Sequence, residues 1–215
     1  MAGIMFSTIP HSSKSRQSYV EALFADVRLK FHDGKYAEAV QDCRGLISMC
    51  SDRGEHIDCA RFLLFIAQIY KVSGSAVLGL PYLLDALSLT DRLHLRTMNA
   101  EAIISVASLY NNLGSHLKSI ATVQQVLPQI MQQGSLMLKT DAHLEMAKSC
   151  IFLSSSDATL LHEGLRLLKL ACQWAETAVY KSASKEAYYL LARVFHQLGD
   201  FAKRNDAAAR FASVG

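Results

Sequence analysis

Apolar residues recur at intervals of three and four along nearly the whole chain, the spacing that places them on one face of an α-helix. Leu and Ala are the most frequent residues of the chain, and Gln, Lys and Glu occur throughout its helical segments. All five residues have high helix propensity. The alternation of apolar and polar residues that indicates strands does not occur in the pattern. We therefore predict an all-α fold.

Glycines divide this helical pattern into hairpins. The segments FHDGKYAEAV, YKVSGSAVLGL, YNNLGSHLKSI and FHQLGDFAKR each place an aromatic residue shortly before a Gly and a new helix after it. A small or β-branched residue stands seven positions before each glycine, and one further residue fits the series: Val27, Ala67, Ala107, Ala147 and Ala192. These residues are separated by 40, 40, 40 and 45 positions. We predict an α-solenoid of about five hairpins with a period of roughly 40 residues.

Small residues also recur in the second helices, at Ala39, Gly79, Ser119 and Gly164 and again at Ala86 and Ala171. Small residues at these positions let paired helices approach closely and are typical of the tetratricopeptide (TPR) hairpin. HEAT repeats have a similar length, but the spacing of the small residues favours a lengthened TPR repeat. The residues assigned to repeat packing are Ala67, Gly74, Ala86, Ala107, Gly114, Ala147, Ala171, Ala192 and Gly199.

The repeat pattern also predicts how the chain is divided. Residues 1–16 are assigned to a flexible N-terminal arm and residues 17–215 to one TPR-like superhelical domain. The five residues that lengthen the fourth repeat are assigned to the serine-rich turn between Leu153 and Leu160, because insertions in surface loops cost little. Pro81 and Pro128 should each mark a helix start or a kink.

In a TPR superhelix the first helix of each hairpin lines a concave face. The inward positions of these helices combine apolar, basic and amide side chains and contain no acid. We predict a groove for a partner segment that brings apolar anchors and negative charge. The polar residues of this groove are Arg28, Gln68, Lys71, Asn111, Lys148, Arg193 and His196. A groove filled by solvent or by a neighbouring helix of the same assembly is the alternative.

Candidate catalytic and metal-binding chemistry is sparse. The nearest His/Cys pair is His56 with Cys59, whereas a zinc site needs four converging ligands. Cys43, Cys150 and Cys172 fall on inward positions and are predicted to be core thiols. The sequence contains no nucleophile elbow and no glycine-rich phosphate loop. We assign no catalytic, cofactor-binding or metal residue, and we predict that the chain is not an enzyme, has no cofactor and takes no small-molecule substrate.

Charge and hydropathy narrow the class of partner. The 215 residues carry 22 Lys+Arg against 19 Asp+Glu, a formal charge of +3, which is not the dense positive field that binds nucleic acid. The longest purely apolar stretch, Phe62 to Ala67, is too short to span a bilayer, and the N-terminus lacks the apolar run of a secretory signal. We expect protein partners, no nucleic acid, no membrane, and a cytosolic or nuclear location.

Three stretches resemble a known family: LPYLLDALSLTDRLHLRTMNAEAIISVASLYNNLG, VLPQIMQQGSLMLKTDAHLEMAKSC and YYLLARVFHQLGDFAKRNDAAARF. The most telling details are the Leu80-Pro81 and Leu127-Pro128 steps, the Gly134-Ser135-Leu136 turn and the Arg204-Asn205 pair in the last segment. These stretches are similar to the C-terminal TPR region of the subunit 5 family of the anaphase-promoting complex (cyclosome). The resemblance covers roughly residues 74–212.

This resemblance implies a non-catalytic scaffold of a ubiquitin ligase that acts in mitosis, located in the nucleus and cytoplasm. The implied partners are platform subunits 1 and 4 and the arc of TPR subunits, while catalysis belongs to cullin-like and RING subunits. Members of the family are considerably longer, so this chain is expected to be a fragment, a truncated gene model or a shortened form. The alternative function is a free-standing TPR adaptor, like kinesin light chains or polarity adaptors, that binds a partner peptide in its concave groove.

Overall fold

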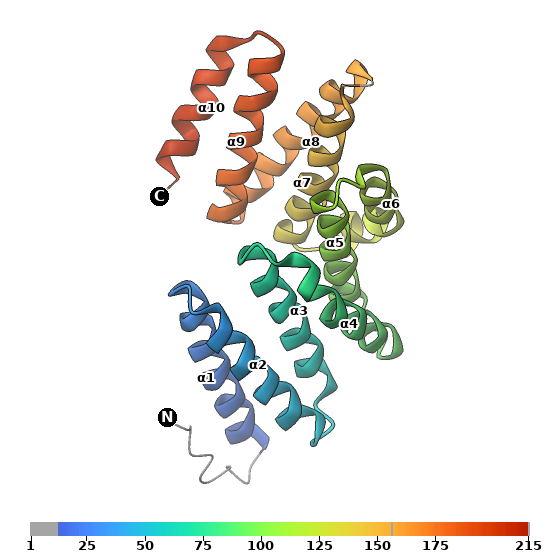
Figure 1. Cartoon of the computed structure of the whole chain (residues 1–215), viewed down its shortest axis with the longest axis vertical. Helices are drawn as coiled ribbons and strands as arrows, with labels where there is room; N and C mark the ends of the chain where they lie inside the picture. The colour runs from blue at the N-terminus through green and yellow to red at the C-terminus, as the bar shows by residue number, and fades with distance from the viewer. Residues whose placement is uncertain (1–12, 156, 215) are drawn as a thin grey trace. The chain divides into compact units, whose positions relative to one another are not determined.

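The computed structural model describes residues 13–155 and 157–214, and this part of the chain folds into ten α-helices and one short 3-10 helix (Figure 1). In chain order they are α1 (Ser13–His32), α2 (Tyr36–Ser51), α3 (His56–Val72), η1 (Ala76–Gly79), α4 (Leu80–Arg92), α5 (Arg96–Asn112), α6 (His116–Gln133), α7 (Leu136–Leu153), α8 (Ala158–Thr177), α9 (Lys181–Gln197) and α10 (Phe201–Ser213). The helices pack in sequence order: α1 packs on α2, α5 on α6, α7 on α8 and α9 on α10, while α3 packs on η1, which leads directly into α4. The predicted all-α array of five hairpins is confirmed.

The chain divides into two compact units, residues 1–89 and residues 90–215. Unit 1 holds α1, α2, α3, η1 and most of α4, and unit 2 holds α5 to α10. A single superhelical domain over residues 17–215 stays a prediction. Helix α1 begins at Ser13, so the last four residues assigned to the flexible arm are helical. The rest of that arm, residues 1–12, lies outside the described residues.

Unit 1 is held together by helix α2 and by aromatic contacts between α1 and α3. Helix α2 packs against both α1 and α3, and the three lie side by side in Figure 1. The Phe24 ring of α1 lies 5.0 Å from the ring of Phe62 and 5.1 Å from that of Phe65, both on α3. Phe31 also contacts Phe65, at 5.4 Å. Aromatic rings therefore form the centre of this core.

Unit 2 has one continuous core that runs from Ala100 in α5 to Ala207 in α10. Each of its helices packs on the next, and the first helices also pack on one another, α5 on α7 and α7 on α9. Helix α7 is covered on most of its surface, because all residues from Ala142 to Ala147 are buried. A helix buried on nearly all sides needs no polar face, although α7 carries buried His143 and Glu145.

The residues assigned to repeat packing lie where helices or turns meet. Five are buried, namely Ala67, Ala86, Ala107, Ala147 and Ala171, and Ala192 is partly buried against the core of unit 2. Gly74, Gly114 and Gly199 stand in hairpin turns with φ of 78°, 72° and 73°. A glycine adopts this left-handed conformation without steric cost.

Gly164 lies where α7 and α8 approach each other closely. A Cβ at Gly164 would lie 3.2 Å from Ile151 Cγ1 and 3.5 Å from the Ala147 carbonyl oxygen. A larger side chain there would push the two helices of the fourth hairpin apart. The predicted role of a small residue at this position is confirmed.

The five-residue insertion of the fourth hairpin is shared between the turn and α8. Helix α8 begins 11 residues after Ala147, whereas α6 begins 9 residues after Ala107. Gly164 lies six residues into α8, while the matching Ser119 lies three residues into α6. The Asp157 side chain caps α8 by accepting a hydrogen bond from the Thr159 amide at 2.9 Å. The insertion therefore lengthens α8 as well as the turn. The assignment of all five residues to the turn is wrong.

Pro81 marks a helix start, as predicted, whereas Pro128 does not. Pro81 is the second residue of α4, where a missing amide hydrogen removes no helical bond. Pro128 lies inside α6, which continues past it to Gln133.

Candidate functional site

The seven residues assigned to the groove all lie on first helices. In unit 1, Arg28 of α1 and Gln68 and Lys71 of α3 are exposed. In unit 2, Asn111 of α5 and Lys148 of α7 are partly buried, while Arg193 and His196 of α9 are exposed. Only Asn111 and Lys148 are thus partly withdrawn from solvent, and the other five side chains are exposed.

Lys148 is held between two carboxylates. Its Nζ atom lies 2.9 Å from Glu145 Oε1 of the same helix and 2.7 Å from Glu186 Oε1 of α9. Burial alone would lower the pKa of the ammonium, but the two carboxylates outweigh it and raise the pKa above its usual value. Lys148 is thus charged throughout the physiological range, and its charge is balanced within unit 2. It links α7 to α9.

Asn111 is the second member of the same network. Its Nδ2 atom donates to the Glu145 carbonyl oxygen and to Glu145 Oε2, both at 2.9 Å. Its Oδ1 atom accepts a hydrogen bond from Ser149 Oγ at 2.6 Å and lies 3.1 Å from His116 Nδ1. Asn111 therefore ties α5 to α7 and to the start of α6.

Glu145 is the residue that joins these contacts, since one carboxylate oxygen meets Lys148 and the other meets Asn111. Only 3% of Glu145 is exposed. A buried carboxylate is stable only when its oxygens are paired, and here both are. We call Asn111, Glu145, Lys148, Ser149 and Glu186 the Glu145 network.

The repeat pattern does not identify Glu145 or Glu186, because neither residue occupies an expected inward position. A local signal was available for one pair. Glu145 and Lys148 are three residues apart on a helix, a spacing that favours an ion pair. Nothing in the local sequence indicates that Glu186 approaches Lys148 from the next hairpin.

An aromatic contact borders the Glu145 network. The His116 ring stacks on Phe152 of α7, with centroids 4.6 Å apart and an interplanar angle of 4°. Phe152 itself is 56% exposed. The pair forms an apolar surface beside the paired charges.

Arg193 and His196 lie on a second aromatic surface, made by α9 and α10. The Arg193 guanidinium carbon is 5.9 Å from the centroid of the exposed Tyr189 ring, and Tyr189 is 6.3 Å from Phe211. The His196 ring is 5.9 Å from that of Phe201. Within the described part of the chain, no carboxylate pairs with Arg193. This surface combines an unneutralised cation with exposed rings.

The outcome for the predicted groove differs from residue to residue. Asn111 and Lys148 are brought together through Glu145 and are already satisfied. Arg28, Gln68, Lys71, Arg193 and His196 lie on exposed parts of their helices, and their role as groove residues stays a prediction.

All five cysteines are free thiols and buried, which confirms the predicted core thiols. Burial raises the pKa of the Cys43, Cys50 and Cys172 thiols to about 12, so these thiols stay protonated. His56 is exposed at the start of α3, and Cys59 is buried. Across residues 13–155 and 157–214, no group of three or more His, Cys, Asp or Glu side chains is arranged to hold a metal ion.

None of the helices in the described residues combines the length and the apolar character needed to cross a membrane.

Comparison with solved structures supports the repeat architecture. A kinesin light chain of Podosopora anserina with nearly identical TPR-like repeats superimposes with a TM-score of 0.61 at 13% identity, covering 92% of this chain and 95% of that one. BtubC of P. vanneervenii superimposes with a TM-score of 0.53 at 12% identity, covering 94% and 91%. At such low identity these similarities show the fold alone.

Sequence comparison gives a more specific relationship. Anaphase-promoting complex subunit 5 of Arabidopsis thaliana is 33% identical over 196 residues, which is 89% of this chain and 21% of that protein. The same subunit of Homo sapiens is 26% identical over 154 residues, 69% of this chain and 20% of that protein. The chain thus spans about a fifth of the length of these relatives. The family profile of the suppressor of spindle checkpoint defect 1 C-terminal domain matches residues 28–215. With nearly all of its solenoid covered by that match, the chain belongs to this family and is a homologue of anaphase-promoting complex subunit 5.

Proposed function

We propose that this chain is the TPR-like segment of a subunit of the anaphase-promoting complex, a ubiquitin ligase. It acts there as a non-catalytic scaffold between platform subunits 1 and 4 and the TPR subunits of the arc. The observation that carries the proposal is the similarity to subunit 5 over 89% of this chain. In this role the chain works in the nucleus and cytoplasm of dividing cells, and catalysis belongs to other subunits.

The Glu145 network supports a structural role. Its hydrogen bonds and ion pairs connect α5, α7 and α9, the first helices of three successive hairpins. A satisfied buried polar network fixes the relative position of the elements it joins. A scaffold needs such fixed spacing, because its partners must be held at constant distances.

Exposed apolar side chains provide contact area for neighbouring subunits. In unit 2, Leu113 and Leu117 flank the turn between α5 and α6, and Phe201 begins α10. Leu117 is 72% exposed. Burying apolar surface in an interface contributes about 25 cal/mol per Å². These side chains are therefore the best places to disrupt docking without disturbing the core.

The test is affinity purification of the tagged chain from dividing cells of its own organism, followed by mass spectrometry. We expect the platform subunits and the TPR arc subunits to co-purify. A Leu117→Glu, Phe201→Glu double variant should lose some of them. A Gln124→Glu, Gln132→Glu double variant, which adds the same charge at exposed polar positions of α6, should retain all of them.

A free-standing peptide-binding adaptor is the second candidate, because Arg193 and Tyr189 form an exposed cation and ring on α9. Recovery of a motor, a cortical protein or one peptide-bearing partner, without subunits of the ligase, would overturn the scaffold proposal. In that case Arg193→Glu with His196→Glu should abolish capture of the partner. Charge reversal at Lys148 is unsuitable for this test, because it would place a third carboxylate beside Glu145 and Glu186.

A further inference from the structure

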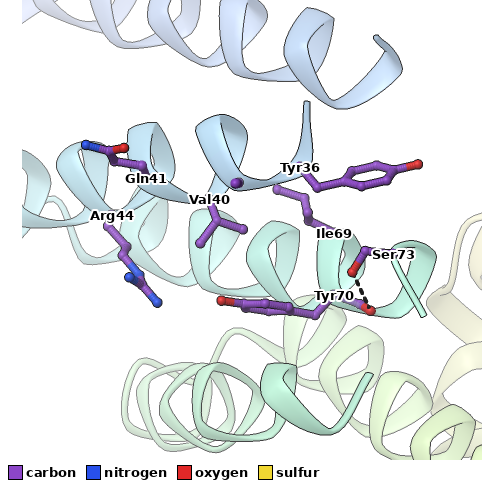
Figure 2. Close-up of a pocket in the computed structure, with 8 residues that line it drawn as sticks. Tyr36, Val40, Gln41, Arg44, Ile69, Tyr70 and Ser73 are labelled. Atoms are coloured by element: carbon purple, nitrogen blue, oxygen red, sulfur yellow. Dashed lines mark hydrogen bonds between the residues drawn. The ribbon is translucent and has the colours of Figure 1, made fainter. Parts of the chain in front are cut away.

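A pocket of about 420 Å³ opens on unit 1 between α2 and α3 (Figure 2). Val40 of α2 and Ile69 of α3 form its apolar floor, and the Tyr70 ring lies along it. Arg44 stands at one end, and Ser73, whose Oγ donates to the Tyr70 carbonyl oxygen at 3.1 Å, stands at the other. The volume falls within the range of about 300–1,000 Å³ that is usual for ligand pockets. It is large enough for a side chain and part of its backbone.

Arg44 is held in place by tyrosines. Its Nε atom donates to the Tyr82 hydroxyl of α4 at 2.8 Å, and its Nη2 atom donates to the same oxygen. The Tyr82 ring stacks on Tyr70 at 5.9 Å, and the Tyr70 hydroxyl points toward the guanidinium (Figure 2). Two of the five N–H donors of the guanidinium are taken by the Tyr82 hydroxyl, and the Tyr70 hydroxyl also interacts with it, so at least two donors remain for another acceptor. The cation is thus positioned in advance, with donors to spare.

No carboxylate among the described residues pairs with Arg44, and none lines the pocket. Two other cations of unit 1 are paired with acids: Lys30 lies 2.5 Å from Asp42, and Arg61 lies 2.7 Å from Glu21. Arg44 therefore keeps its full charge beside an apolar hollow. This combination calls for an occupant with both an apolar group and an anionic group.

We propose that this pocket receives a short segment of a partner protein in which an aromatic or aliphatic residue stands next to an Asp or Glu. The apolar side chain fills the pocket over Val40 and Ile69, and the carboxylate takes the remaining donors of Arg44. Arginine suits this task because its planar fork can hold a carboxylate through two parallel hydrogen bonds. The inference rests on the proposed function only in that the segment belongs to a neighbouring subunit of the complex.

The equivalent groove of unit 2 offers a natural comparison. A pocket of about 320 Å³ lies among α8, α9 and α10, and Lys169 occupies the position of α8 that corresponds to Arg44 once the insertion is counted. Glu176 and Asp206 line this second pocket, and Arg210 pairs with Asp206 at 3.2 Å. Because this pocket carries its own carboxylates, it should not attract an acidic segment.

The experiment selects random dodecapeptides displayed on phage against the full chain and measures the affinity of the enriched peptides by fluorescence anisotropy. We expect peptides with an apolar residue beside Asp or Glu. Arg44→Glu should weaken their binding at least tenfold, and Arg44→Lys should weaken it less, because lysine keeps the charge and loses the fork. Replacing the peptide's acid with Lys should restore binding to the Arg44→Glu chain.

Two further variants separate the pocket from general charge and from misfolding. Ala37 is exposed at the rim, so Ala37→Trp should block the pocket without entering the core and should also weaken binding at least tenfold. Lys169→Glu, which makes the same charge reversal in the other groove, should leave the affinity unchanged. Far-UV circular dichroism melts of each variant verify that the helices are intact.

The inference is overturned if no peptide is enriched, if the enriched peptides lack the acidic residue, or if Lys169→Glu weakens binding as much as Arg44→Glu. Peptide binding does not require the complex, so its result is separate from the affinity purification. Pocket binding with no recovery of ligase subunits would reject the proposed function and leave the pocket assignment standing. Recovery of ligase subunits without peptide binding at the pocket would reject only the pocket assignment.

Discussion

The two units make the same contact between first helices from different side chains. In unit 1, α1 and α3 meet through aromatic rings, and the Arg61 guanidinium lies 4.9 Å from the Phe24 centroid and 5.2 Å from that of Phe62. In unit 2, α5, α7 and α9 meet through small residues and the Glu145 network. The repeat therefore specifies the spacing of the helices and leaves the chemistry of their contact open.

This difference should determine how each unit responds to substitution. Ring packing is not strongly directional, and the Arg61 ion pairs are partly exposed, so each pair contributes no more than about 1 kcal/mol. The contacts of Glu145 are directional and buried, and losing one partner leaves another without compensation. We expect unit 2 to be the more sensitive of the two to loss of a single polar group.

The largest expected effect is that of Glu145→Ala, which removes a buried carboxylate and leaves Lys148 and Asn111 short of a partner. We expect unit 2 to lose about 3 kcal/mol of stability. The counterpart in unit 1, Glu21→Ala, should cost less than about 1 kcal/mol. Trp174, the only tryptophan, lies in α8 and reports on unit 2 by fluorescence during urea unfolding, while circular dichroism follows both units.

A double variant tests the reason for that loss. Adding Lys148→Met to Glu145→Ala removes the ammonium that would otherwise lack a partner, so part of the stability should return. Equal losses of stability for Glu145→Ala and Glu21→Ala would contradict the expected difference between the units. If the double variant regains no stability, the loss in Glu145→Ala comes from packing alone.

The next effect concerns a feature that the units share. Ala107 of α5 is fully buried, and Ala67 holds the matching position in α3. Ala107→Phe and Ala67→Phe should each overpack a hairpin and cost roughly 1–3 kcal/mol. Ser155→Phe, at an exposed turn, should be nearly silent in urea unfolding. Equal effects at Ala107 and Ser155 would contradict the repeat assignment.

A smaller and opposite effect is expected at the turns that link one hairpin to the next. Gly54 occupies such a turn in unit 1 with φ of 72°, whereas the matching residue in unit 2 is Val179 with φ of 54°. A β-branched residue is strained there by about 1–2 kcal/mol. Val179→Gly should therefore raise the melting temperature of unit 2. Leu84→Gly is the control, because a glycine at this exposed helical position should lower stability by about 1 kcal/mol. If Val179→Gly also lowers stability, Val179 is not strained.

The smallest effect is a pH dependence of unit 2 that comes from His143. Burial lowers the pKa of His143, whose ring packs edge-on against Trp174 at 4.7 Å, while its hydrogen bond to the Lys139 carbonyl opposes the shift. The unfolded chain takes up this proton near pH 6.5. Stability should therefore fall as the pH drops through about 6.5 and level off below the folded-state pKa.

Urea midpoints from Trp174 fluorescence between pH 7.5 and pH 5 measure this dependence. His143→Phe keeps a ring against Trp174 and removes the titration, so its midpoints should vary less with pH. The charged neighbours Glu163 and Arg166 are present in both the original chain and the variant, so their own titration contributes equally to both pH profiles. An unchanged slope in the variant would exclude His143 as the cause.

Much of the fold could be predicted because its signals are local. Helical periodicity, the turn glycines and the small residue of each hairpin all act within a few residues of one another. The start of α8 was harder to place, since the Asp157 cap lies in the inserted segment and shifts the helix relative to the other repeats. Lys148 is a residue for which local signals fail. Its repeat position predicts an ammonium that is available to a partner, but in the structure two carboxylates pair with it.

The number of hairpins, their small-residue contacts, the burial of the thiols and the family can all be predicted from the amino-acid sequence. Which charges on the helix faces are paired, and which are available, depends on how the helices pack. Arg44 meets Tyr82 across 38 residues, and Asn111 meets Glu145 across 34. Contacts of this kind depend on how neighbouring hairpins pack, because a shift of a few ångströms between helices makes or breaks a hydrogen bond while leaving the repeat pattern unchanged.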